Sequence, residues 1–189
     1  MHSKFEVIFW NIAGIANMEG DLIEGINSYS ILCLYETWVD DVTMNLPRHL
    51  ATRGFTFVNS PAVRTASRGR AKGGIICVIN KNIYNFSTVY MSKFFLFIRI
   101  SNINVIIGIV YVSPLEILNG VLEEVGSIIN ELQSTFMDHK ILVGGDFNAR
   151  IGEKNCELDG FFSKIHLCMK EGKVWIRKLM VGEEACLNA

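Results

Sequence analysis

The 189-residue sequence lacks the features that mark several classes of protein. Only 20% of its residues are charged and 50% are hydrophobic, which excludes a disordered chain and a simple coiled coil. Its apolar runs, such as residues 105–112, end well before the roughly 18 residues that a membrane-spanning helix needs. Residues 1–4 lead into a strand-like segment, so we expect neither a signal peptide nor a membrane partner. The length predicts one globular domain with one core.

The cysteines lack the spacing of a metal site or a disulfide framework. Five are present, an odd number, and none belongs to a C-x-x-C pair. They are Cys33, Cys77, Cys156, Cys168 and Cys186. This pattern argues against structural zinc and favours a reducing compartment, in which we expect the thiols to be core or loop residues.

Acidic residues are absent from residues 42–115, although the whole chain has 18 basic and 19 acidic residues and a net charge of -1. This stretch holds half of the basic residues: Arg48, Arg53, Arg64, Arg68, Arg70, Lys72, Lys81, Lys93 and Arg99. A cationic segment in an otherwise acidic molecule favours a polyanion such as DNA or RNA, because neutralised phosphates release counterions. A solvated basic face without a ligand explains the charge equally well at this point.

Short segments rich in Ile, Val and Phe predict strands at residues 5–10, 31–35, 55–58, 75–79, 94–100, 105–112 and 141–143. A hairpin turn is expected at 101–104. Helical spacing predicts helices at 19–28, 115–135 and 170–187. The second helix carries one apolar stripe, which consists of Leu118, Leu122, Val125, Ile129 and Leu132. This order of elements favours a mixed sheet system covered by helices.

Polar side chains stand at the ends of four predicted strands. Asn11 ends the first strand, Glu36 follows the second, Tyr111 lies near the end of a hairpin strand, and Asp146 and Asn148 follow the strand at 141–143. Functional groups of α/β proteins concentrate at such strand ends, so we expect these residues to converge. Two carboxylates and a neutral amide suit Mg²⁺ or Mn²⁺, whereas nothing in this set suggests zinc.

Two flanking segments agree with a phosphate site. In the run Gly144 to Arg150, two glycines permit close backbone approach, and the period of a strand puts Asp146 and Asn148 on one side. Residues 68–74 alternate basic with small side chains, a pattern suited to a loop along a sugar-phosphate backbone. The predicted nucleic-acid contacts are Arg64, Arg68, Arg70 and Lys72.

Five motifs in register resemble the endonuclease/exonuclease/phosphatase superfamily. They are Trp10–Gly14, Leu34–Trp38, Gly73–Ile75, Val110–Pro114 and Gly144–Arg150. The match covers residues 5–152 and is most similar to the apurinic-type endonuclease domain of non-LTR retrotransposons. The resemblance implies a four-layer α/β/β/α sandwich of two mixed sheets flanked by helices, with the final strands missing. It divides the chain into a core at 1–152 and a partial, degenerate continuation at 153–189.

Two residues favour the retrotransposon branch over the repair branch. Ala13 and Trp38 stand where similar repair proteins usually carry an acidic residue and a lysine. We expect Trp38, like Trp10, to be a packing residue rather than a platform on which bases stack. The resemblance also implies that such a domain belongs to a longer polyprotein with a reverse transcriptase.

The resemblance implies metal-assisted hydrolysis of a phosphodiester and assigns a role to each site residue. Glu36 would hold Mg²⁺ or Mn²⁺ with help from Asn11, and Asp146 would contact the metal and orient or deprotonate the attacking water. Asn148 and Tyr111 would steady the phosphate. DNA is the implied partner, and no obligate protein partner is implied. A DNA substrate would place the protein inside the cell and in the nucleus, although no basic import signal stands out.

One part of the family's site is missing. The family uses a histidine in a Ser-Asp-His run, and none of His2, His49, His139 and His166 replaces it; His139 lies at the wrong end of its strand. We therefore expect a truncated or decayed copy with impaired activity. Two alternatives stay open: a catalytically silent relic that retains weak nucleic-acid binding, and a small-phosphoester phosphatase of the same superfamily.

Each site residue also has a purely structural interpretation. Asp146 and Asn148 suit a turn after a strand. Tyr111 suits a core position with a satisfied hydroxyl group, and Glu36 suits a surface carboxylate. Only the spatial arrangement of these side chains separates the two interpretations.

Overall fold

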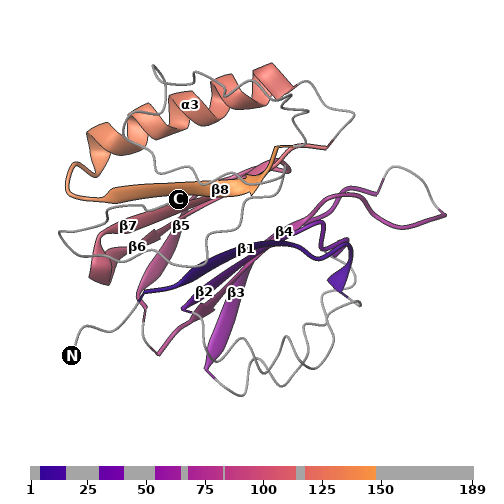
Figure 1. The fold of residues 1–189 in the computed structure, drawn as a ribbon, viewed down its shortest axis with the longest axis horizontal. Coiled ribbons are helices and arrows are strands. Elements are labelled where there is room, and N and C mark those ends of the chain that lie inside the picture. The colour runs from indigo at the N-terminus through magenta and orange to yellow at the C-terminus, as the bar shows by residue number, and fades with distance from the viewer. Residues whose placement is uncertain are drawn as a thin grey trace, which may run out of the picture.

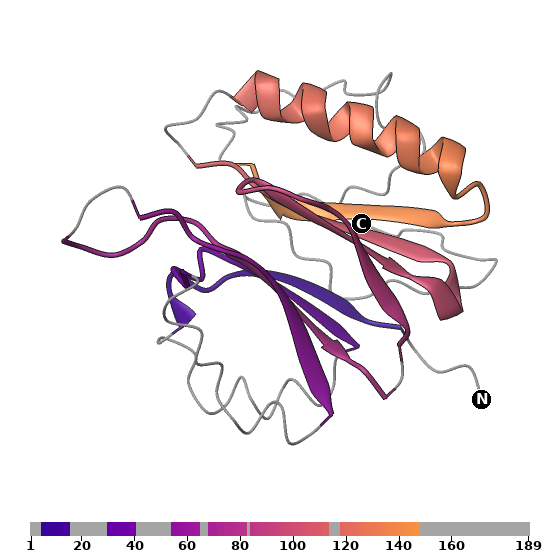
Figure 2. The ribbon, with the colours of Figure 1, turned by 180° about the vertical axis from the view of Figure 1, so that it is seen from behind.

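Two four-stranded β-sheets packed face to face form the centre of the molecule (Figure 1). The computed structural model describes residues 5–15, 30–40, 54–64, 68–82, 84–113 and 118–147. Helix α3 (Leu118–Thr135) lies along the outer face of the second sheet, as the views from the front and from behind both show (Figures 1 and 2).

The first sheet has the strand order β1-β2-β4-β3. Its strands are β1 (Val7–Asn11), β2 (Ile31–Tyr35), β3 (Phe55–Ser60) and β4 (Ile75–Asn80). β1 and β2 are parallel, and the other neighbours are antiparallel. Asn11 therefore lies opposite Tyr35, and β1 and β2 end at the same rim of the sheet.

The second sheet has the order β5-β6-β7-β8. Its strands are β5 (Phe86–Met91), β6 (Phe95–Ile100), β7 (Val105–Tyr111) and β8 (Lys140–Asp146), and the short 3₁₀ helix η2 (Ser101–Ile103) joins β6 to β7. β7 and β8 are parallel and are connected through α3, which places Tyr111 opposite Asp146. The remaining pairs are antiparallel.

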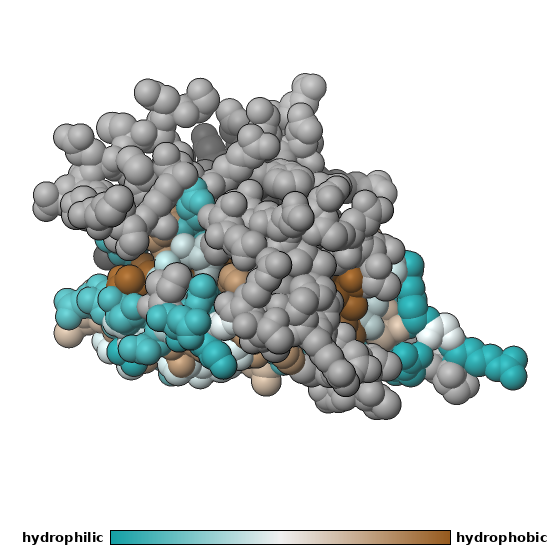
Figure 3. All heavy atoms as spheres, turned by 90° about the horizontal axis from the view of Figure 1, so that it is seen from below, coloured by the Kyte–Doolittle hydropathy of each residue, from teal (hydrophilic) through white to brown (hydrophobic). Residues whose placement is uncertain are grey.

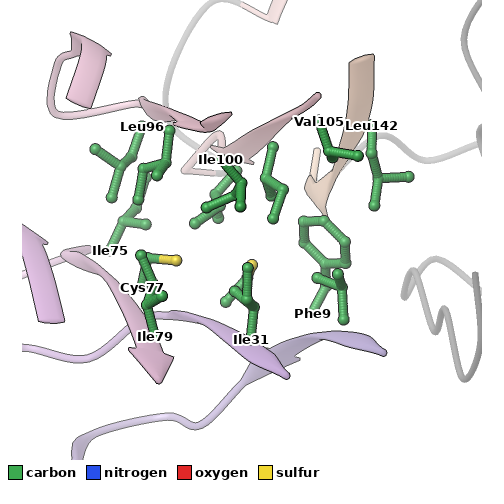
Figure 4. Packing of buried hydrophobic residues seen from close by; sticks show 14 of the residues in the cluster. Phe9, Ile31, Ile75, Cys77, Ile79, Leu96, Ile100, Val105 and Leu142 are labelled. Atoms are coloured by element: carbon green, nitrogen blue, oxygen red, sulfur yellow. The ribbon is translucent and has the colours of Figure 1, made fainter. Parts of the chain in front are cut away.

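Apolar side chains from both sheets fill the space between them (Figure 4). Phe9, Ile31 and Cys77 of the first sheet point toward Leu96 and Leu142 of the second. Burial of such side chains at ~25 cal/mol per Å² of apolar surface is the main stabilising term of the fold. Every residue of β2 and of β7 is buried, so both faces of these central strands are covered. The core is therefore a rigid support for whatever projects from the strand ends.

The structure confirms the predicted fold class of two mixed sheets with helical cover. All seven predicted strands are present, as is the turn at 101–104, where Asn104 adopts a left-handed backbone. Helix α3 buries Val125, Ile129 and Leu132 of the predicted stripe against the second sheet. The helices predicted at 19–28 and 170–187 lie outside the described residues, and so does the boundary proposed at 152/153.

Strand β5 was not predicted from the sequence. Its residues Phe86–Met91 are partly buried or exposed throughout, because β5 is an edge strand. A mixed polar and apolar pattern of this kind gives a weaker strand signal than a buried run.

Cys33 and Cys77 confirm the expectation of core thiols. They lie opposite each other in β2 and β4, and both are free and buried. Burial raises the pKa of the Cys33 thiol, and the neighbouring Cys77 raises it further. Within the described ranges no helix is long and apolar enough to cross a membrane.

Candidate functional site

The ends of four strands bring the predicted polar residues to one rim of the paired sheets. Asn11 is the last residue of β1, Tyr111 of β7 and Asp146 of β8, and Glu36 follows β2 directly. β1 and β8 point toward the same end of the molecule (Figure 1). Parallel neighbours share a carboxyl end, so each sheet delivers two of these side chains to the rim.

Two hydrogen bonds connect these side chains across the gap between the sheets. Asn11 Nδ2 donates to Asp146 Oδ2 at 3.2 Å, while Asn11 Oδ1 accepts from the backbone N–H of Ala13 at 3.1 Å. The Tyr111 hydroxyl donates to Glu36 Oε1 at 2.5 Å. Each bond joins one residue of the first sheet to one of the second. The predicted convergence of Asn11, Glu36, Tyr111 and Asp146 is therefore present in the structure.

Two tyrosine hydroxyls at the rim have raised pKa values. Burial raises the pKa of the Tyr111 hydroxyl, and the hydrogen bond to Glu36 and the charges of Glu36 and Asp146 raise it further. Burial also raises the pKa of Tyr35, with smaller contributions from Asp146, Cys33 and Glu36. The two tyrosine rings stack at 6.2 Å between centroids. Both hydroxyls stay protonated at neutral pH, so Tyr111 acts as a hydrogen-bond donor.

Residues beside the site adopt a left-handed backbone that costs energy in side chains other than glycine. Ala13, Glu36 and Trp38 have φ angles of 45°, 55° and 58°. Hydrogen bonds from the backbone N–H of Trp38 to the Gly73 carbonyl and from that of Gly14 to the Glu36 carbonyl hold this segment. Backbone strain of ~1–3 kcal/mol per residue typically clusters at functional sites. No feature of the sequence signals these conformations.

The two glycines before Asp146 permit the close approach that the sequence predicted. A Cβ added to Gly144 would lie 2.8 Å from the Phe9 ring of the facing sheet. A Cβ added to Gly145 would overlap the carbonyl oxygen of Val110. Both glycines therefore fix the position of Asp146. Asn148, the other predicted residue of this run, lies outside the described residues.

The donor set fits a hard divalent cation. The site offers the carboxylates of Glu36 and Asp146 and the amide of Asn11. No group of three His, Cys, Asp or Glu side chains gathers anywhere in the part of the chain that the structure describes. The charges of both carboxylates contribute to the raised pKa of Tyr111 and of Tyr35, so both carboxylates lie near these hydroxyls. Oxygen donors with concentrated negative charge suit Mg²⁺, which binds through one or two carboxylates and keeps several waters.

Residues 61–64 and 68–74, which lie between β3 and β4, form an arm beside the site. Backbone pairing of Val63 with Lys72 holds its two halves together. The arm projects from the rim that carries the site (Figures 1 and 2), and it is mostly hydrophilic (Figure 3). Arg68, Arg70 and Lys72, three of the four predicted nucleic-acid contacts, are exposed on it.

Arg64, the fourth predicted contact, has a local structural role. Its Nε and Nη2 donate to Asp40 Oδ2 at 2.9 and 2.7 Å, and its Nη1 donates to the Gly69 carbonyl at 2.6 Å. These bonds tie the arm to the segment that follows β2. Contact between Arg64 and a nucleic acid stays a prediction.

We expect Arg64→Gln to lower the free energy of unfolding by about 1–2 kcal/mol, because two charged hydrogen bonds to the largely buried Asp40 are lost. The loss is no larger because solvent already screens part of this ion pair. Arg68→Gln removes the same charge from an exposed position of the same arm and should change stability by less than about 0.5 kcal/mol. Urea unfolding of both variants measures the difference. Equal stabilities would show that the Asp40 contact contributes nothing.

His139 lies at the other end of β8 from Asp146, which confirms its predicted distance from the site. Its Nε2 accepts a hydrogen bond from Arg99 Nε at 2.9 Å. Burial lowers the pKa of His139 and Arg99 lowers it further, against an opposing effect of Asp138, so the ring is neutral at pH 7. His2, His49 and His166 lie outside the described residues.

The structure is similar to solved structures of several nucleases. An AP endonuclease from Archaeoglobus fulgidus matches with a TM-score of 0.55 and 16% identity over 86% of this chain and 65% of the other. The 3'-5' exonuclease NExo from Neisseria meningitidis matches at 0.50 and 17%, over 76% and 58%. The endonuclease domain of TRAS1, a telomere-specific non-LTR retrotransposon, matches at 0.48 and 14%, over 78% and 62%. No protein-family model and no curated protein matches the sequence.

The chain therefore has the fold of the endonuclease/exonuclease/phosphatase superfamily, as its motifs predicted. It spans less than two thirds of the length of each of these structures. The structural similarity to the AP endonuclease and to the exonuclease, at identities of 16% and 17%, establishes the fold alone and does not distinguish branches within it.

Proposed function

We propose that this chain is a divalent-metal-dependent phosphodiesterase that nicks DNA and that derives from a non-LTR retrotransposon. The observation that carries the proposal is the meeting of Asn11, Glu36, Tyr111 and Asp146 at one rim, joined by two hydrogen bonds between the sheets. If Asp146 only formed a turn and Glu36 were only a surface carboxylate, neither side chain would need a hydrogen bond to the other sheet. The five sequence motifs, and a fold shared with an AP endonuclease and an exonuclease, support the same reaction class.

Asp146 is the residue proposed to act on the attacking water. Its carboxylate is mostly buried and is held in place by the Asn11 amide, so one oxygen is oriented by the protein. A carboxylate can accept a proton from water at neutral pH when a bound metal ion lowers the pKa of that water. Asn11 is a positioning residue in this scheme, because its amide fixes the direction of the Asp146 side chain.

Tyr111 is proposed to bind the reacting phosphate. Because its hydroxyl keeps its proton at neutral pH, it can donate to a phosphoryl oxygen on which charge develops. In the structure the hydroxyl donates this proton to Glu36, so it has to turn from Glu36 to the phosphoryl oxygen when a substrate binds. Asn148 is proposed to act beside Tyr111 as a second donor.

Glu36, Asn11 and Asp146 are proposed to hold Mg²⁺ or Mn²⁺. Such an ion, when bound, lowers the pKa of a coordinated water and neutralises charge on the phosphoryl oxygens. Glu36 keeps one carboxylate oxygen beyond the one that accepts from Tyr111, so both functions fit one side chain.

DNA is proposed as the substrate on account of the basic arm. Arg68, Arg70 and Lys72 are exposed on the arm, which projects at the rim that carries the site (Figure 1). Counterion release favours the binding of a polyanion there. Ala13 and Trp38 support the retrotransposon branch, whose domains occur in polyproteins with a reverse transcriptase and would act in the nucleus.

A plasmid-nicking assay with Mg²⁺ tests the proposal. We expect conversion of supercoiled to relaxed DNA that EDTA abolishes. Glu36→Gln keeps an oxygen to accept the Tyr111 hydrogen bond but removes the charge, and should lower the nicking rate about 10²-fold or more while raising the Mg²⁺ concentration needed.

Two other outcomes would contradict the proposal. Hydrolysis of p-nitrophenyl phosphate with an intact plasmid would move the assignment to the phosphatase branch. Salt-sensitive DNA binding with no cleavage, unchanged by Glu36→Gln, would identify a catalytically silent relic.

A further inference from the structure

Trp38 and Arg70 form a stack at the base of the arm. The guanidinium carbon of Arg70 lies 4.0 Å from the centroid of the Trp38 ring. The indole also packs closely on Gly14, where an added Cβ would overlap the ring. Trp38 is therefore the packing residue that the sequence predicted, and it has a second contact that the sequence did not indicate.

The position of the stack connects the arm to the catalytic rim. Trp38 stands two residues after Glu36, and its backbone N–H donates to the carbonyl of Gly73 on the arm at 3.0 Å. A bulky side chain at φ 58° is rare, so the surrounding contacts hold it there at a cost in energy. The indole is thus a fixed platform, whereas Arg70 is exposed.

Stacking leaves a guanidinium well suited to bind phosphate. A cation–π contact of the guanidinium carbon with the indole does not require the N–H donors as hydrogen bonds, so these donors can still bind an anion. An arginine whose orientation is already restricted loses less side-chain entropy when it binds an anion. An unstacked surface arginine has no such advantage.

We infer that Trp38 and Arg70 act as one phosphate-binding unit, which holds the phosphate of the DNA strand next to the phosphate that is cleaved. The inference rests on the proposed function and deepens it. A site that binds two phosphates selects a polynucleotide backbone over an isolated phosphoester. Trp38 is the positioning residue of the unit, and Arg70 is the group that contacts the strand.

Fluorescence anisotropy with a labelled duplex oligonucleotide, in EDTA at several salt concentrations, tests the unit without cleavage. Arg70→Gln should weaken binding several-fold and reduce the slope of log K against log[salt] by about 0.9, the value for one phosphate contact. Arg70→Lys should keep the slope and still bind more weakly, because a lysine lacks the planar stack. Trp38→Leu should weaken binding with the slope unchanged, whereas Trp38→Phe should retain most of the affinity.

A matched control exists at the opposite end of the sheets. Arg99 also stacks on an aromatic ring, that of Phe136, at 4.8 Å. Arg99→Gln removes the same charge from a similar stack and should leave affinity and salt slope unchanged. Thermal unfolding of each variant verifies that the fold is intact.

A double-mutant cycle distinguishes a unit from two independent residues. If Trp38 acts through Arg70, the double variant Arg70→Gln/Trp38→Leu should bind no more weakly than Arg70→Gln alone. Additive effects, or an Arg70→Gln variant that binds like Arg99→Gln, would overturn the inference.

Nicking by the unaltered protein is measured separately. If the unaltered protein cleaves DNA but Arg70→Gln changes neither binding nor KM, the inference is overturned and the proposed function stands. A non-additive cycle without cleavage by the unaltered protein would overturn the proposed function and leave the phosphate-binding unit.

Discussion

Replacement of Asp146 by Asn is expected to lower kcat for plasmid nicking by about 10²–10⁴-fold, the usual contribution of a positioned acid or base. Asparagine has the same shape, and its carbonyl oxygen can still accept from Asn11 Nδ2, so the hydrogen bond between the sheets survives. The variant lacks the charge that binds a cation and the basic oxygen that accepts a proton. Steady-state kinetics measures kcat, and anisotropy with labelled DNA checks that affinity is retained.

A matched control lies at the other end of the same strand. Asp138 is exposed and precedes β8, whereas Asp146 ends it. Asp138→Asn makes the same chemical change and should leave kcat unaltered. An Asp146→Asn variant that kept more than a tenth of the nicking rate would show that this carboxylate neither holds the metal nor activates the water.

Asn11 provides a graded test of the same scheme. Asn11→Ala removes the amide that orients Asp146 but leaves both carboxylates, so the loss should be smaller, about 10–100-fold. In the double variant with Asp146→Asn, the loss should be smaller than the product of the two single losses, because the part of the Asn11 effect that comes from orienting Asp146 is already lost in Asp146→Asn.

The sequence predicted the position of the site because the rule that places it is geometric. Functional groups of α/β proteins concentrate at strand ends, so apolar runs that lead to Asn11, Glu36, Tyr111 and Asp146 predicted their convergence, and the parallel pairs β1/β2 and β7/β8 bring it about. The buried strands were predicted because their sequences are apolar runs; every residue of β2, for example, is apolar and buried. The edge strand β5 has no such signal and was missed.

Contacts between distant residues were beyond the reach of the sequence. Asn11 and Asp146 are separated by 135 residues, and nothing in either motif specifies that an amide donates to a carboxylate. The same holds for the contact of Arg64 with Asp40, which no motif indicated, whereas the predicted contact of Arg64 with a nucleic acid stays a prediction. The left-handed backbone at Glu36 and Trp38 depends on bonds to the neighbouring chain, which single-residue preferences do not encode.

Replacement of Gly145 by Ala is expected to destabilise the fold by about 3–5 kcal/mol, which is among the largest effects of single substitutions. Gly145 has φ 150°, a conformation that other residues rarely adopt. The new methyl group would also overlap the carbonyl oxygen of Val110 in β7. Relief requires β8 to move away from β7, which weakens their backbone hydrogen bonds and displaces Asp146.

Gly120→Ala is the matched control for this prediction. Gly120 lies in helix α3, and an added Cβ would meet no atom within 4 Å. Alanine in an exposed helix should stabilise the protein by about 0.5–1 kcal/mol. Urea unfolding compares the two variants, and nicking should be lost only with Gly145→Ala. If Gly145→Ala were as stable as the unaltered protein, β8 would have room to bear a side chain there. The close approach of β8 to β7 would then not be what positions Asp146.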